Sequence, residues 1–125
     1  MAGPNGAHVE GDQLVVNTWG VLTGEGFNTS VAGHVLSISL KDKSITDVAG
    51  GKPFGNLDGL WPLGGGAYLN TDFMAGKLLK LNPDGKVEEL LVLSKGAADI
   101  GYDPDNKTLY IPNMVSSTLT AYRLP

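Results

Sequence analysis

Hydrophobic and polar residues alternate along much of this chain, in short runs separated by turns. The clearest run is residues 34–40, where leucine and isoleucine occupy positions 36, 38 and 40 and valine and serine occupy positions 35, 37 and 39. A period of two places successive side chains on opposite faces of an extended strand. The pattern predicts a protein of short β-strands, and no stretch shows the spacing of an amphipathic helix.

Turn signals divide these runs. Residues 82–85 read Asn-Pro-Asp-Gly and residues 64–66 are three glycines, and both sequences favour tight reversals of the backbone. Residues 20–32 are rich in glycine and threonine and are predicted to form a loop. The expected strands are residues 7–10, 13–19, 34–40, 44–49, 60–63, 67–71, 77–81, 86–93, 100–102, 108–111 and 118–124.

The strand pattern repeats along the chain. Residues 14–18 (Leu-Val-Val-Asn-Thr) correspond to residues 67–71 (Ala-Tyr-Leu-Asn-Thr), and these to residues 109–113. The first interval is the longer one because residues 20–32 form an insertion. A period of about 40–50 residues with about four strands is typical of a propeller blade.

The fold prediction is therefore all-β. It consists of three four-stranded antiparallel propeller blades, the last one strand short, in a single half-propeller domain that spans residues 1–125. The expected blades cover residues 4–50, 55–94 and 97–125.

Three blades are too few to close a ring, which normally needs about four to eight. An open set of blades leaves an apolar sheet face uncovered at each end, and a second copy of the chain would cover both and complete a six-bladed ring. The alternative is that the chain is a fragment of a longer propeller whose other half supplies the missing blades.

Composition narrows the function. Thirteen acidic and nine basic residues give a net charge of −4, which argues against a nucleic-acid partner. The absence of cysteine excludes a disulfide framework and thiol chemistry. We expect no membrane-spanning segment and no signal peptide, because no apolar run is long enough and the first residues lack the pattern of a leader. The compartment is left open.

Three oxygen-bearing side chains occupy corresponding positions in the repeats. Asn5, Asp58 and Asp99 each fall just before or at the first strand of a predicted blade. First strands line the channel of a propeller, so these side chains are expected to converge there. Their oxygens suit a divalent cation, Ca²⁺, Mg²⁺ or Zn²⁺. The alternative is that each residue caps a turn by bonding local backbone.

These motifs resemble a known family, the gluconolactonase, regucalcin and senescence-marker-protein group of six-bladed propellers. The resemblance implies a divalent metal, most simply Ca²⁺, in the channel and hydrolysis of a sugar lactone. It further implies that Asn5 and Asp58 are metal ligands and that Asp58 is the general base. The family's other ligands, a glutamate and an asparagine, lie in the half that this chain does not match. The motifs are Pro4-Asn5-Gly6, Leu57-Asp58-Gly59-Leu60, residues 97–102 and residues 119–124.

A small-molecule ligand in the channel would need walls as well as a polar centre. Trp19, Phe27, Trp61 and Phe73 are candidates for an apolar rim around it. The alternative is packing between blades, which we favour for Trp61 because it lies in a first strand. At the level of function, the alternative to a lactonase-like hydrolase is a non-catalytic propeller scaffold of the NHL-repeat kind that binds a ligand or a protein.

Overall fold

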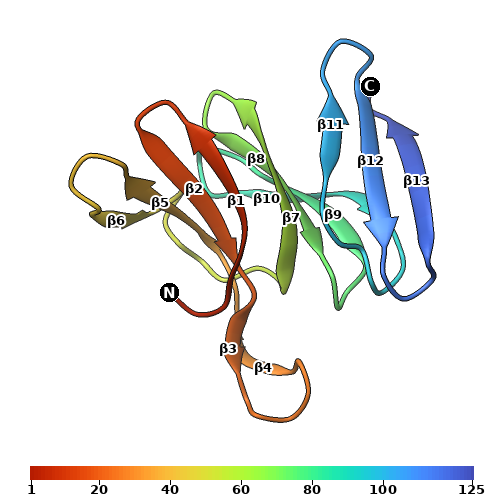
Figure 1. Cartoon of the computed structure of the whole chain (residues 1–125), viewed down its shortest axis with the longest axis horizontal. Coiled ribbons are helices and arrows are strands. Elements are labelled where there is room, and N and C mark those ends of the chain that lie inside the picture. Colours follow the sequence, from red (N-terminus) through yellow and green to blue (C-terminus); the bar gives the residue numbers. More distant parts are fainter.

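The computed structural model describes residues 1–125 and contains thirteen β-strands and no helix (Figure 1). All strand pairs are antiparallel. The prediction of an all-β antiparallel fold is therefore confirmed. No segment of the protein forms a helix that could span a membrane.

Eleven strands build three sheets. The first sheet contains β1 (Pro4–Glu10), β2 (Gln13–Thr18), β5 (Val35–Ser39) and β6 (Ile45–Asp47), in that order. The second contains β7 (Leu57–Gly64), β8 (Ala67–Asp72), β9 (Lys77–Leu81) and β10 (Val87–Val92). The third contains β11 (Gly101–Asp103), β12 (Thr108–Asn113) and β13 (Thr118–Arg123).

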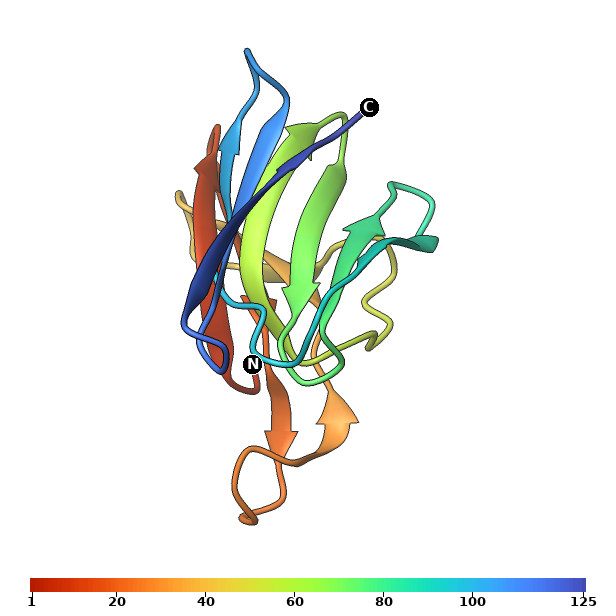
Figure 2. The same ribbon diagram turned by 90° about the vertical axis from the view of Figure 1, so that its right-hand side faces the viewer.

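Residues 20–32 do not form the predicted loop. They form a two-stranded hairpin of β3 (Gly20–Leu22) and β4 (Thr29–Ala32), which projects away from the three sheets (Figures 1 and 2). Val21 and Val31 are direct partners across this hairpin. A cross-strand pair of β-branched residues favours extended backbone, and this outweighs the glycine-rich composition of the segment.

Two hydrophobic clusters hold the sheets together, one on each face of the second sheet. Tyr68 belongs to the first cluster, with Val15 and Val35 of the first sheet. Leu69, the next residue of β8, belongs to the other cluster, with Leu109 and Ile111 of the third sheet. Because neighbouring residues of a strand point to opposite faces, β8 contributes to both cores. The second sheet is thus sandwiched between the other two, which lie at the two ends of the molecule (Figure 1).

Candidate functional site

The first strands of the first two sheets bring the candidate ligands together. Asn5 lies in β1 and Asp58 lies in β7. The side-chain amide of Asn5 donates a hydrogen bond of 3.2 Å to the carbonyl oxygen of Leu57, the residue before Asp58. Both Asn5 and Asp58 line two cavities, and Asp99, which precedes β11, lines one of them.

Both residues occupy irregular positions in their strands. The register of β1 shifts between Pro4 and Ala7, so Asn5 falls within the irregular segment. The register of β7 shifts between Leu57 and Leu60, around Asp58. A bulge re-aims a side chain out of the ordinary pleat, and bulges are common next to functional sites. The repeated Asn-Gly and Asp-Gly motifs therefore mark equivalent irregularities in β1 and β7.

The glycines of these motifs permit close approach between sheets. A Cβ atom placed on Gly6 would lie 2.6 Å from the carbonyl oxygen of Asp58. A Cβ atom on Gly59 would lie 2.6 Å from Cγ1 of Ile100 and 2.7 Å from the carbonyl oxygen of Ala98. Any larger residue would push the first strands apart, so the glycines set how closely the candidate ligands converge.

The side chain of Asn17 links β1 to β7. Its side chain is fully buried at the end of β2. The Asn17 amide nitrogen donates to the carbonyl oxygens of Asp58 at 3.1 Å and Gly59 at 3.0 Å. Its Oδ1 accepts a hydrogen bond of 2.8 Å from the backbone N–H of Gly6. One buried amide therefore holds the backbone beside both Asn5 and Asp58.

Thr71 makes the corresponding link to the third sheet. Its hydroxyl is fully buried, accepts a hydrogen bond of 2.8 Å from the backbone N–H of Gly59 and donates one of 2.6 Å to the carbonyl oxygen of Ala98. Sequence reasoning assigned no role to Asn17 or Thr71. The available signal was the repeated Asn-Thr pair, residues 17–18 and 70–71, at the ends of otherwise apolar strands.

Asp58 is the most electrostatically perturbed carboxylate of the site. Burial raises its pKa above the ordinary aspartate value, the amide of Asn5 opposes this, and the negative charge of Asp99 raises the pKa further. A carboxylate of raised pKa is a stronger base than one on the open surface, and it gains from a neighbouring cation.

The donor set has the chemistry of a hard-cation site. Asn5 and Asp58 offer an amide and a carboxylate oxygen, and the amide nitrogen of Asn5 is already bonded to Leu57, which leaves its oxygen free to act as a ligand. No three histidine, aspartate or glutamate side chains lie close enough together to hold a metal by themselves. Because Ca²⁺ takes about six to eight oxygen ligands, these residues fit as part of a larger ligand set.

The candidate rim residues divide between the two cavities. Trp19, Phe27 and Phe73 line a cavity of about 390 Å³, which we call the aromatic cavity. The ring of Trp19 lies 5.9 Å from that of Phe27 and 5.5 Å from that of Phe73, centroid to centroid.

Trp61 lines a second cavity of about 400 Å³ together with His8 and Asp99, which we call the polar cavity. Its ring packs at 4.9 Å from the ring of His8 and 6.2 Å from that of Tyr102. Trp61 therefore packs against side chains of the first and third sheets and also lines a cavity. The Asn5–Asp58 pair lies between the aromatic cavity and the polar cavity, because both residues line each.

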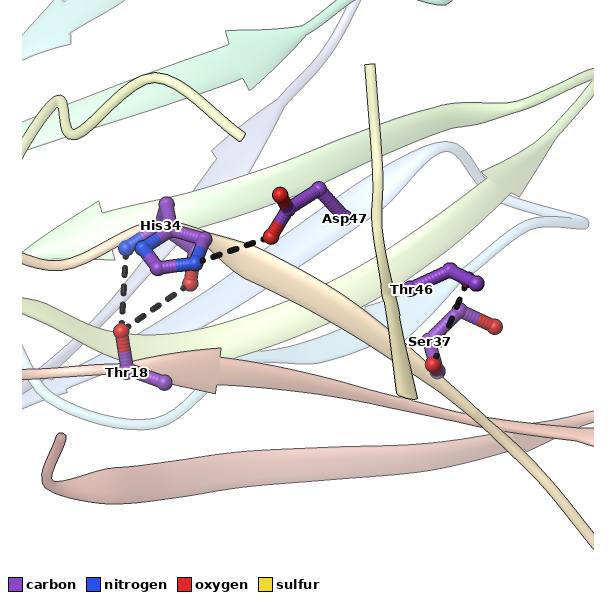
Figure 3. A network of polar contacts seen from close by, with 5 residues as sticks. All are labelled: Thr18, His34, Ser37, Thr46 and Asp47. Atoms are coloured by element: carbon purple, nitrogen blue, oxygen red, sulfur yellow. Dashed lines mark hydrogen bonds and ion pairs between the residues drawn. The ribbon is translucent and has the colours of Figure 1, made fainter. Parts of the chain in front are cut away.

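His34, the second histidine of the chain, makes contacts that stabilise the first sheet. The backbone N–H of His34 donates to the hydroxyl of Thr18 at 3.0 Å, and that hydroxyl lies 3.2 Å from the carbonyl oxygen of His34 (Figure 3). The imidazole Nε2 lies 3.4 Å from the carboxylate of Asp47 (Figure 3). His34 lines neither cavity, and its contacts hold the start of β5 against β2.

Comparison with known proteins defines the fold. No family model and no curated protein matches the sequence. Among solved structures, a gluconolactonase from Xanthomonas campestris superposes with a TM-score of 0.70 at 19% identity, covering 100% of this chain and 39% of that protein. A virginiamycin B lyase from Staphylococcus aureus gives 0.56 at 18% identity, covering 99% and 42%. A streptogramin B lyase gives 0.55 at 18% identity, covering 95% and 40%.

These neighbours are propellers, so the chain has the fold of a gluconolactonase-like β-propeller fragment. It spans about two fifths of the length of the proteins that it matches.

Proposed function

We propose that this chain is half of a six-bladed, lactonase-like propeller that binds a divalent cation between Asn5 and Asp58 and hydrolyses a lactone or ester. The three sheets serve as its blades. The observation that carries the proposal is the meeting of an amide and a carboxylate at equivalent bulges of two inner strands. The likeness of the fold to a gluconolactonase supports the same reading.

Each residue of the pair has a distinct role in this proposal. The oxygen of the Asn5 side chain and the carboxylate of Asp58 would hold the cation, most simply Ca²⁺, with Mg²⁺ or Zn²⁺ as alternatives. A cation bound there would polarise an ester carbonyl as a Lewis acid. In the same proposal, a carboxylate oxygen of Asp58 would accept a proton from the water that attacks the carbonyl carbon.

The second copy would complete the ring. The register places Val9, Leu14, Ile38 and Ile45 side by side across the first sheet, and Val9 and Ile45 are 68% and 54% exposed. At the other end of the molecule, Leu119 is 70% exposed on the third sheet. Two copies related by a two-fold axis would bury both end faces, and the partner's Asn5 and Asp58 would add ligands to the same channel.

Thermal unfolding and acid release test the proposal together. Ca²⁺ should raise the midpoint temperature of unfolding of the wild type and leave that of Asp58→Ala unchanged. Asp105→Ala, at an exposed turn, is the control and should respond to Ca²⁺ like the wild type. Release of acid from glucono-δ-lactone or dihydrocoumarin in excess of the spontaneous hydrolysis should require the cation and be lost in Asp58→Ala. Equal shifts in the wild type and Asp58→Ala would remove Asn5–Asp58 as the metal site.

The alternative function is a non-catalytic scaffold of the NHL-repeat kind. The aromatic cavity favours it, because apolar walls of this volume can retain a small molecule without chemistry. Saturable ligand binding without acid release at any divalent cation would identify this function in place of the hydrolase.

A further inference from the structure

The aromatic cavity is unusual in how its polar and apolar parts are divided. Of its nine lining residues, five are hydrophobic, and the polar side chains belong to Asn5 and Asp58 alone. The cavity therefore has an apolar body and one polar edge. That edge is the pair which the proposed function assigns to the cation. The hydrophobic residues are Trp19, Leu22, Phe27, Phe73 and Met114.

The walls are held in place by hydrogen bonds. The amide nitrogen of Asn56, which precedes β7, donates to the carbonyl oxygen of Trp19 at 3.0 Å and to the hydroxyl of Thr29 at 2.9 Å. These bonds fix the β3–β4 hairpin against the connection between the first two sheets. The backbone N–H of Phe73 donates to the carbonyl oxygen of Asn56 at 3.0 Å. Asn56 therefore positions the two walls that carry Trp19 and Phe73.

The one polar group of the aromatic wall is already engaged. The indole N–H of Trp19 donates a hydrogen bond of 2.9 Å to the carbonyl oxygen of Phe27. It is therefore unavailable to a ligand hydroxyl. The side chains of the wall therefore offer a ligand apolar and aromatic contact, and the free polar side-chain groups lie at Asn5 and Asp58. A wall of this kind favours a flat apolar ligand.

From this arrangement we infer that the aromatic cavity binds an aromatic ring that is joined to a lactone or ester carbonyl, with the carbonyl directed at Asn5 and Asp58. This inference rests on the proposed function for the role of the pair, but the apolar part is independent of any cation. The volume of about 390 Å³ lies within the range of small-molecule sites, and three aromatic rings offer edges and faces to a bicyclic ligand.

The test measures binding in EDTA, so that it does not depend on metal or turnover. Dihydrocoumarin is the aromatic lactone and glucono-δ-lactone the sugar lactone, and the readout is the NMR signal of the Trp19 indole N–H, assigned with Trp61→Phe. Dihydrocoumarin should shift this signal saturably, and glucono-δ-lactone at equal concentration should not. Equal shifts with both lactones, or none with dihydrocoumarin, would overturn the inference.

Matched variants locate the binding. Phe27→Ala should weaken dihydrocoumarin binding roughly tenfold, whereas Val21→Ala, an exposed residue of the same hairpin outside the cavity, should leave it unchanged. Met114→Ala, on the far wall, should also weaken it, which a distorted hairpin could not explain. Equal affinity of Phe27→Ala and Val21→Ala contradicts the inference. Binding that persists without metal-dependent hydrolysis supports the inference and removes the proposed hydrolase.

Discussion

Asn17 and Asp58, 41 residues apart, are joined by a hydrogen bond of 3.1 Å from the side-chain amide of Asn17 to the backbone carbonyl of Asp58. The bond connects the second strand of one sheet to the first strand of the next. Asn17 is fully buried, and its hydrogen bond to the carbonyl oxygen of Gly59 is buried with it. The geometry of the candidate site therefore depends on a residue that does not line either cavity.

Replacing Asn17 should destabilise the protein. Asn17→Ala leaves the backbone N–H of Gly6 without its partner and removes a donor from the carbonyls of Asp58 and Gly59, so we expect a loss of about 3 kcal/mol in the free energy of unfolding. Asn28→Ala, at an exposed position in the β3–β4 hairpin, should change it by less than about 0.5 kcal/mol. Urea unfolding measures both, and equal values for the two variants would show that the buried amide is not a structural link.

Alanine substitutions at Gly59 and Gly101 form a matched pair that tests how closely the sheets approach each other. Gly59→Ala places a methyl group against Ile100 and the carbonyl of Ala98, and should cost about 1–3 kcal/mol. Gly101→Ala meets nothing closer than 3.9 Å and should be neutral or slightly stabilising. Thermal unfolding of both variants checks this prediction, and a Gly59→Ala variant as stable as Gly101→Ala would contradict the tight contact.

The ionisation of the Tyr68 phenol should make the free energy of unfolding depend on pH in the alkaline range. Burial, with a further contribution from its 2.6 Å hydrogen bond to the Glu10 carboxylate and from the charge of that carboxylate, raises the pKa of Tyr68 to about 12. The unfolded chain therefore loses the phenolic proton first, at a pKa of about 10. The stabilisation from Tyr68 is fully present below pH 10 and is lost as the pH rises toward 12.

Comparison with Tyr68→Phe isolates this effect. The wild type should be more stable than Tyr68→Phe by about 1 kcal/mol near neutral pH, because the variant lacks the hydrogen bond to Glu10. The difference should shrink as the pH rises from 10 to 12. Urea unfolding at a series of pH values measures it, and a difference that grows with pH would contradict the assigned direction.

An uncovered sheet face predicts how the proposed dimer can be broken. Leu119→Arg places a charge on the exposed face of the third sheet and should weaken self-association by more than about a hundredfold, because an unpaired charge would be buried in the contact. Val92→Arg, at a 76% exposed position of β10 in the central sheet, is the control and should associate like the wild type. Analytical ultracentrifugation over a concentration series distinguishes them.

Much of the fold followed from local pattern. Alternation across residues 34–40 predicted an extended strand, and the structure has β5 at Val35–Ser39. The repeat also placed Asn5 and Asp58 at equivalent positions of two first strands, as the structure has them. These features could be predicted because the alternation of a strand and the corresponding positions of a repeat can both be read directly from the sequence.

Other features depend on contacts that no local pattern encodes. The hairpin at residues 20–32 formed because Val21 meets Val31 across the turn, a pairing hidden by the surrounding glycines. The sequence offered four aromatic candidates for one rim, with packing favoured for Trp61, and in the structure Trp61 lines the polar cavity while Phe73 lines the aromatic one. The side on which a side chain lies depends on how the sheets are placed relative to one another and on where a bulge shifts the register, and neither is visible in one strand.

The mass of the protein in solution tests most directly the claim that this chain is a half ring completed by a second copy. Sedimentation equilibrium at micromolar concentration should give about twice the chain mass of 13.1 kDa, because the first and third sheets otherwise leave apolar faces in water. A folded monomer of 13.1 kDa across the whole concentration range would contradict the account.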